Sequence, residues 1–229
     1  MTRMSKAKAD RILSGAGWLS EQPEAFRAEV LQRSKLLRYA PGDVVFRLGD
    51  PIGGIYGLVD GTVAANIAPP MSIPRLIHLG APGHWTGEGC FFTRHPRRGE
   101  LRAIVETWMM HLPLEAMDQI AALDPQAARH FAQILMVTFT TLVRVIHDLQ
   151  KPEATRRIAS VLNRATWIGD RPIPLSQAEF GAMANASRKQ VNAALQCFAA
   201  EGWLTHTYRS ITIVNAEALR LFAEKEDES

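Results

Sequence analysis

The sequence is poor in cysteine and in net charge. Its 229 residues include two cysteines, Cys90 and Cys197, which lie far apart. Two distant thiols cannot supply a disulfide scaffold, a Cys-only zinc site or a four-cysteine iron–sulfur cluster. No apolar stretch reaches the ~20 residues that a bilayer requires, and residues 1–10 lack the apolar core of a signal peptide. These absences predict a reduced, cytoplasmic setting with no membrane partner. The net charge of +3 by itself indicates no class of partner.

Residues 36–112 have the pattern of a β-domain. Gly and Pro recur at short intervals and separate short apolar runs such as Val44–Phe46 and Ile55–Val59. Many short strands with evenly spaced turn signals predict a β-barrel or jelly roll. Asp60-Gly61, which lies between two apolar runs, predicts a hairpin.

Residues 125–150 have the pattern of one long helix, because Gly is absent and Pro occurs only at position 125. Apolar residues at alternating spacings of three and four, completed by one threonine, form a coiled-coil seam. The predicted dimer interface is Phe131, Leu135, Thr138, Leu142, Val145 and Leu149. A second apolar stripe faces elsewhere: Ile134, Met136, Phe139, Val143 and Ile146. A helix with two apolar sides needs two partners, which we take to be its own β-domain and a second copy. The alternative is a helix that only covers a core.

Residues 173–214 predict a winged helix-turn-helix, in a stretch (151–215) with a net charge of +4. Two capping boxes, Ser176–Glu179 and Ser187–Gln190, flank a turn residue, Asn185. Two strand-like runs follow as the wing. The second helix exposes long donors and amides, which can bind base edges in the major groove. The predicted DNA contacts are Ser176, Gln177, Ser187, Arg188, Lys189, Gln190, Asn192, Tyr208 and Arg209. The alternative is a structural helical hairpin with a solvated basic face.

Together these segments resemble the CRP/FNR family of bacterial transcription regulators. The resemblance rests on residues 39–50, 59–63, 82–88, 157–159 and 175–198. It implies an α+β fold with a jelly-roll-like, cyclic-nucleotide-binding-type β-roll sensor (1–112), a dimerisation or linker helix (113–150) and a C-terminal winged helix-turn-helix (151–229). It also implies a homodimer that binds near-palindromic double-stranded DNA and is not an enzyme. RNA polymerase is a further candidate partner.

The resemblance implies an effector pocket that departs from the family pattern. In nucleotide-binding members a Gly-Glu pair holds the ribose and phosphate, and an Arg followed by Ser or Thr binds the cyclic phosphate. Gly87 and Glu88 match the pair, and Arg97 or Arg98 matches the Arg, but the following residue lacks a hydroxyl. The helix positions that reach adenine align with Leu142 and Val143, which offer no hydrogen bond. We therefore expect a pocket at these six residues, no cofactor, and an effector other than cyclic AMP.

The resemblance also implies an unusual DNA target. Many members have Glu at the position of Lys189 and Arg at that of Ala193, and neither residue here can make the same base contact. Two other functions are weighed against the regulator. One is a cyclic-nucleotide-binding sensor module without direct DNA readout. The other is a cupin-like metalloenzyme, which needs a converging His/Glu set. The histidines are scattered, which argues against a metal site and against haem: His78, His84, His95 and His111.

Overall fold

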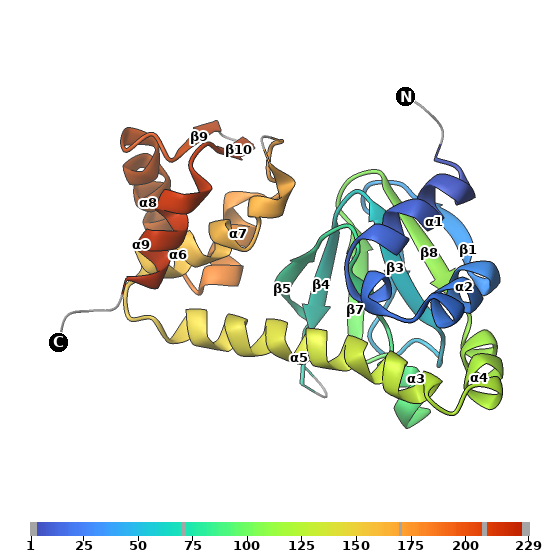
Figure 1. Cartoon of the computed structure of the whole chain (residues 1–229). Helices are drawn as coiled ribbons and strands as arrows, with labels where there is room; N and C mark the ends of the chain where they lie inside the picture. The colour runs from blue at the N-terminus through green and yellow to red at the C-terminus, as the bar shows by residue number, and fades with distance from the viewer. Residues whose placement is uncertain (1–3, 70–71, 170, 208–209, 226–229) are drawn as a thin grey trace. The chain divides into compact units, whose positions relative to one another are not determined.

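The computed structural model describes residues 4–69, 72–169, 171–207 and 210–225 (Figure 1). The chain divides into two compact units, residues 1–142 and 143–229. The division falls inside one long helix, α5 (Ala127–Gln150). It does not test the domain boundaries predicted at residues 112 and 150, which stay predictions.

Two four-stranded antiparallel sheets form the framework of the first unit. Their strand orders are β1-β8-β3-β6 and β2-β7-β4-β5. The strands are β1 (Lys35–Tyr39), β2 (Val44–Phe46), β3 (Ile55–Asp60), β4 (Val63–Ile67), β5 (Arg75–Gly80), β6 (Trp85–Thr86), β7 (Gly99–Ala103) and β8 (Thr107–Leu112). Leu58, Val63, Leu101 and Met109 form a buried cluster contributed by both sheets. This is the predicted jelly-roll-like β-roll.

The hairpin predicted at Asp60-Gly61 is wrong. β3 pairs with β6 and β8, whereas β4 pairs with β5 and β7. The turn therefore carries the chain from one sheet to the other. Gly61 has a φ of +97°, and a Cβ atom there would lie 2.6 Å from the carbonyl oxygen of Glu106. A tight turn needs Gly here in either case, so the dipeptide alone does not reveal which strand pairs with which.

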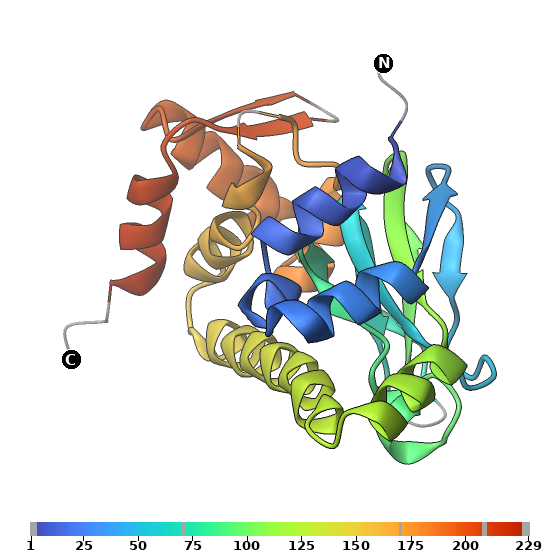
Figure 2. The same ribbon diagram turned by 45° about the vertical axis from the view of Figure 1, so that its right-hand side comes forward.

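Helices cover the outer face of the first sheet and enclose the main core of this unit. α1 (Lys6–Gly15) packs on β3, and α2 (Glu24–Arg33) packs on β8 and α4 (Leu114–Leu123). Figures 1 and 2 show these helices beside the sheet. The sequence pattern predicted neither N-terminal helix. The first part of α5 joins the same core, where the ring of Phe131 lies 5.1 Å from those of Phe26 and Phe91. A short helix, α3 (Gly89–Thr93), follows β6.

The second unit contains the predicted winged helix-turn-helix. Its elements are α6 (Ala154–Asn163), α7 (Gln177–Ala184), α8 (Arg188–Ala200), β9 (Leu204–Thr207), β10 (Ser210–Ile213) and α9 (Ala216–Glu224). β9 and β10 form the antiparallel wing, and Ile173 adds one bridge to Ile211. Asn185 adopts the left-handed conformation between α7 and α8, with a φ of 46°. The turn predicted from its residue type is confirmed.

Candidate nucleic-acid interface and effector pocket

Two capping boxes fix where the helices of the reading unit begin. Ser187 Oγ accepts a hydrogen bond from the backbone N–H of Gln190 at 3.3 Å, and Gln190 Oε1 accepts one from the backbone N–H of Ser187 at 2.9 Å. Ser176 and Glu179 make the same pair of bonds at the start of α7. The side chains of Ser176, Ser187 and Gln190 thus hold the helix starts. Their predicted contacts to DNA stay predictions.

The exposed face of α8 carries two cations. Arg188 and Lys189 are exposed, and within the described part of the chain neither side chain has an ion-pair partner. The opposite face is anchored by Val191, Leu195 and Phe198, which are completely buried. This anchor fixes which face of α8 is buried, so the two cations extend from the exposed face. Of the other predicted contacts, Gln177 and Asn192 are half-buried, while Tyr208 and Arg209 lie outside the described residues.

One arginine secures the turn that precedes α8. Arg157 of α6 donates from Nε to the carbonyl oxygen of Ala184 at 2.9 Å and from Nη2 to that of Asn185 at 3.1 Å. Its Nη1 donates to the carbonyl oxygens of Lys151 and Pro152 at 2.7 and 2.8 Å. A single guanidinium therefore ties the end of α7 to the segment that joins α5 and α6. The planar guanidinium of Arg carries several N–H donors in a fixed arrangement, which lets one side chain bind these four carbonyl oxygens at once.

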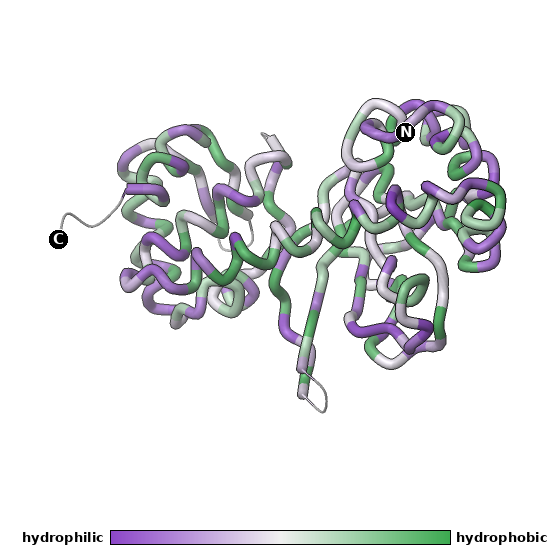
Figure 3. Tube along the Cα trace, turned by 60° about the horizontal axis from the view of Figure 1, so that its bottom comes forward, coloured by the Kyte–Doolittle hydropathy of each residue, from purple (hydrophilic) through white to green (hydrophobic). Residues whose placement is uncertain are grey.

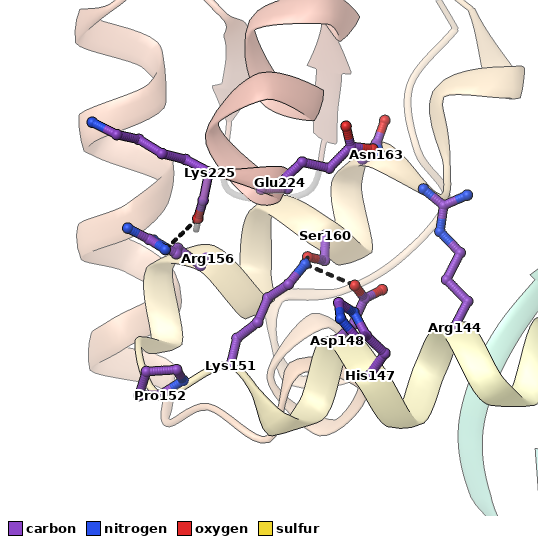
Figure 4. A pocket seen from close by; sticks show the side chains of 11 residues that line it. Arg144, His147, Asp148, Lys151, Pro152, Arg156, Ser160, Asn163, Glu224 and Lys225 are labelled. Atoms are coloured by element: carbon purple, nitrogen blue, oxygen red, sulfur yellow. Dashed lines mark hydrogen bonds and ion pairs between the residues drawn. The ribbon is translucent and has the colours of Figure 1, made fainter. Parts of the chain in front are cut away.

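A buried ionic group lies at the same junction (Figure 4). Asp148 is 6% exposed and accepts hydrogen bonds from Lys151 Nζ at 2.9 Å and from the guanidinium of Arg164. Lys151 Nζ also donates to Ser160 Oγ at 2.7 Å. Burial lowers the pKa of Arg164, and the charge of Asp148 opposes that shift. A cavity of about 470 Å³ adjoins this group and is lined by basic side chains that include Arg144 and Arg156.

The first unit holds a second cavity, of about 430 Å³, where the effector pocket was predicted. Five of the six predicted residues line it: Gly87, Glu88, Arg97, Arg98 and Leu142. Val143 does not line it, and its side chain is 47% exposed. The helix also presents Thr138 and Thr141 to this cavity. Leu142 and Val143 offer no hydrogen bond, as expected from their side chains, but two hydroxyl side chains at earlier positions of the helix line the cavity.

Arg97 is held against the pocket wall by its own chain. It is 6% exposed and donates from Nη1 to the carbonyl oxygen of Gly87 at 3.0 Å and from Nη2 to that of Gly54 at 2.7 Å. Its guanidinium also lies 4.5 Å from the ring centroid of Phe46. A Cβ atom at Gly53 would come within 2.5 Å of the same guanidinium. Arg97, one of the two arginines that could match the family's phosphate ligand, thus has two of its N–H groups bound to backbone carbonyls.

Glu88 joins the pocket to α5. Its carboxylate is 5% exposed and accepts a hydrogen bond from Thr138 Oγ1 at 3.2 Å. Burial raises the pKa of this carboxyl, and the Thr138 hydrogen bond opposes the rise. Thr138 was predicted to lie in a dimer seam, but its hydroxyl faces Glu88 instead.

The predicted dimer seam is only partly exposed. Phe131 is fully buried in the core of its own unit, Val145 is 5% exposed, and Leu142 lines the pocket. Leu135 also lines the pocket but stays half-exposed, as does Leu149. The second stripe is the outward one, apart from the buried Ile134: Met136, Phe139, Val143 and Ile146 are 47–58% exposed. The prediction that Phe131 and Val145 lie in the dimer interface is therefore wrong, because both side chains are buried within their own chain. Both stripes are apolar at helical spacing, so periodicity could not tell which one faces the core.

Hydrophobic residues recur along the whole of α5 (Figure 3). Within the described residues it is the one helix long and apolar enough to cross a membrane by length and composition alone. Such a test is also passed by helices of soluble proteins. Here Phe131 and Ile134 lie in the core of the first unit, while Met136, Phe139, Val143 and Ile146 are exposed.

A β-roll with a ligand-sized pocket, a long helix and a winged helix-turn-helix define a DNA-binding transcription regulator. The family model of the cyclic nucleotide-binding domain matches residues 36–124, and that of the Crp-like helix-turn-helix domain matches residues 156–222. The chain belongs to the CRP/FNR family of transcription regulators, whose members bind DNA and act as dimers, and it is not an enzyme.

Relatives with assigned roles cover nearly the whole chain. The CRP-like cAMP-activated global transcriptional regulator of Mycobacterium tuberculosis is 24% identical over 92% of this chain and 97% of that protein. Among solved structures, FixK2 from Bradyrhizobium japonicum matches 84% of this chain and 98% of its own, with a TM-score of 0.71 and 18% identity. The c-di-GMP responsive regulator CLP of Xanthomonas campestris matches 83% of this chain and 99% of its own, with a TM-score of 0.66 and 20% identity.

Proposed function

We propose that this protein is a homodimer that reads a near-palindromic DNA site by placing α8 of each copy in the major groove. The observation that carries the proposal is the exposed pair Arg188 and Lys189 at the start of a helix whose other face is buried. Donors in this position can reach guanine O6 and N7 or a phosphate. Two copies related by two-fold symmetry would contact half-sites about one helical turn apart.

The dimer would form through the outward stripe of α5. Met136, Phe139, Val143 and Ile146 follow one another at spacings of three, four and three, which is the repeat of a coiled-coil seam. Their exposure leaves large apolar side chains in water, and pairing with the same stripe of a second copy removes them from it. This seam replaces the one predicted from the sequence.

We also propose that cyclic AMP is not the effector, although the name of the Mycobacterium tuberculosis relative states that cAMP activates it. The support is Arg97, two of whose donors are bound to the carbonyl oxygens of Gly54 and Gly87. A cyclic phosphate that used these two donors would displace both bonds, and the freed buried carbonyls would lose their partners. No cofactor is required by this function. A cytoplasmic location and contact with RNA polymerase are parts of the same proposal.

The sensor module without DNA readout is the less favoured function, because the Crp-like helix-turn-helix match covers the reading unit. The experiment that separates the two is selection from a random duplex-DNA pool at fixed salt, with no ligand added. An enriched two-fold symmetric site would support a dimeric DNA reader that is active without an effector. Weak, sequence-blind binding in the absence and presence of cell extract would refute the proposal.

A further inference from the structure

The cavity of the β-roll has a mainly apolar wall. Strands of one sheet, the short helix α3 and the long helix α5 contribute to it, with the large side chains of Phe46, Ile67, Ile77, Phe92, Leu101, Leu135 and Leu142. Its volume of about 430 Å³ lies within the ~300–1,000 Å³ range of small-molecule sites. Such a wall favours a ligand with a large apolar surface, because binding removes that surface from water.

The acidic groups on the wall already have partners. Glu88 accepts the hydrogen bond from Thr138, and Glu100 pairs with Arg102 at 3.2 Å. The imidazole of His84 is neutral near pH 7, because desolvation lowers its pKa to about 4. These groups therefore present neither a free anion to attract a cationic ligand nor a cation to attract an anionic one.

The two neighbouring arginines on the wall differ in whether their guanidinium groups already have partners. Arg97 is buried and bound to backbone carbonyls, whereas Arg98 is exposed and has no ion-pair partner among the residues that the structure describes. Among the described residues that line this apolar cavity, Arg98 is thus the arginine whose guanidinium has no hydrogen bond or ion pair in the structure. A single guanidinium at the rim suits one carboxylate, which it can bind with two parallel hydrogen bonds.

From these contacts we infer that the pocket binds an amphipathic monocarboxylate, with its apolar body inside the cavity and its carboxylate on Arg98. The inference rests on the proposed function, since it names the effector class of the same regulator. A cyclic nucleotide fits this wall poorly, because its phosphate and base edge are polar at both ends of the molecule.

The test uses the full-length protein and cis-parinarate, a fatty acid whose fluorescence rises in apolar surroundings. We expect saturable binding, displacement by decanoate at micromolar concentration, and no displacement by cyclic AMP at a hundredfold higher concentration. Displacement by cyclic AMP with none by decanoate would overturn the inference. A lack of saturable binding by either class would overturn it as well.

Variants locate the two ends of the ligand. Arg98→Gln is expected to weaken decanoate severalfold and to leave decanol unchanged, because only the acid uses the guanidinium. Leu135→Glu places a carboxylate in the wall and is expected to weaken decanoate at least tenfold. Thr140→Glu is the matched control, since this exposed residue lies on the same helix and does not line the cavity. Equal effects of Leu135→Glu and Thr140→Glu would refute the assigned cavity.

The DNA selection described above separates this inference from the proposed function. If an enriched symmetric site is found and decanoate does not bind, the effector class is wrong and the DNA reader stands. If decanoate binds and no DNA sequence is enriched with or without it, the proposed DNA-reading function is wrong, and the assigned ligand class is still supported. The two results come from independent measurements on the same protein.

Discussion

At the scale of single residues, the reading helix depends on a small number of side chains with separate tasks. Ser187 and Gln190 set where α8 begins, Arg157 fixes the turn before it, and Arg188 and Lys189 face outward. A change in one of the capping residues should weaken the start of the helix, whereas a change in an outward cation should alter only the contact that it makes.

Replacing Arg188 by alanine should weaken binding to the selected DNA site by ~1–3 kcal/mol per half-site and relax its preference at one base pair. The reason is that an arginine at a helix start can bind guanine through two hydrogen bonds. Competition binding on a set of single-base variants of the site measures both effects. Lys8→Ala, an exposed lysine of α1, is the control. If affinity falls equally on all sequences, and the slope of log affinity against log salt concentration decreases in magnitude by about one, Arg188 would instead contact a phosphate.

His84 should make stability depend on pH. Desolvation lowers its pKa from 6.5 to about 4. Between these two pH values the imidazole is protonated in the unfolded chain and neutral in the folded chain. Folding stability from this residue is therefore lost as the pH falls from 6.5 towards 4, by about 3 kcal/mol at most. Glu88 acts in the opposite sense: its raised pKa makes stability fall as the pH rises above its ordinary value near 4.5.

The variant His84→Gln isolates the first effect, because Glu88 is present in both proteins. Urea unfolding between pH 7 and pH 4.5 should show the native protein losing ~2 kcal/mol more than the variant. Parallel losses in the two proteins would mean that His84 titrates normally in the folded state.

Residue roles were predictable from the sequence where the partner is near in the chain. The two capping boxes link residues three positions apart, and both are formed as predicted. The role of Arg97 was not predictable, because its carbonyl partners lie 10 and 43 positions away. Thr138 was assigned to the wrong neighbour for the same reason, since Glu88 is 50 positions distant. Only the fold brings these pairs together.

At the scale of elements, the sequence predicted the long helix correctly, but it did not predict which of the two apolar stripes of the helix is the more exposed. α5 covers residues 127–150 and lacks Gly and Pro, as the sequence indicated. Two apolar stripes run along it, and the stripe that completes the regular heptad pattern buries Phe131 and Val145 while Leu135 and Leu149 stay exposed. A coiled-coil repeat is equally compatible with a core and with a partner helix, because both remove apolar side chains from water.

The two possible seams can be separated by charge substitution. Phe139→Glu should weaken the dimer at least a hundredfold, because a carboxylate would be buried against its symmetry mate without a partner. Leu149→Glu tests the seam predicted from the sequence, and should have a smaller effect. Sedimentation equilibrium of each variant gives the dissociation constants. If Leu149→Glu separates the copies and Phe139→Glu does not, the outward stripe is not the interface.

At the scale of the whole molecule, the two compact units meet within α5, between Leu142 and Val143. The break at Lys151-Pro152 is a natural candidate for a hinge through which the β-roll could reorient the readers, because the residue before Pro avoids the α region. The structure braces that break. Arg157 binds the carbonyls of both residues, and Lys151 binds Asp148 and Ser160. We therefore expect the end of α5 to move together with the reading unit.

This expectation separates two substitutions that lie four residues apart. Pro152→Ala should change DNA affinity less than twofold with and without effector, because the hydrogen bonds across the break do not depend on the ring. Asp148→Asn should destabilise the protein by ~3 kcal/mol, since it removes the carboxylate from two largely buried cations, Lys151 and Arg164. Urea unfolding and DNA titration of both variants measure these effects.

A large change in effector-dependent DNA affinity for Pro152→Ala alone would place the hinge at residues 151–153. A loss of effector-dependent DNA affinity confined to Asp148→Asn would mean that the regulator transmits its signal through the buried ionic group at Asp148.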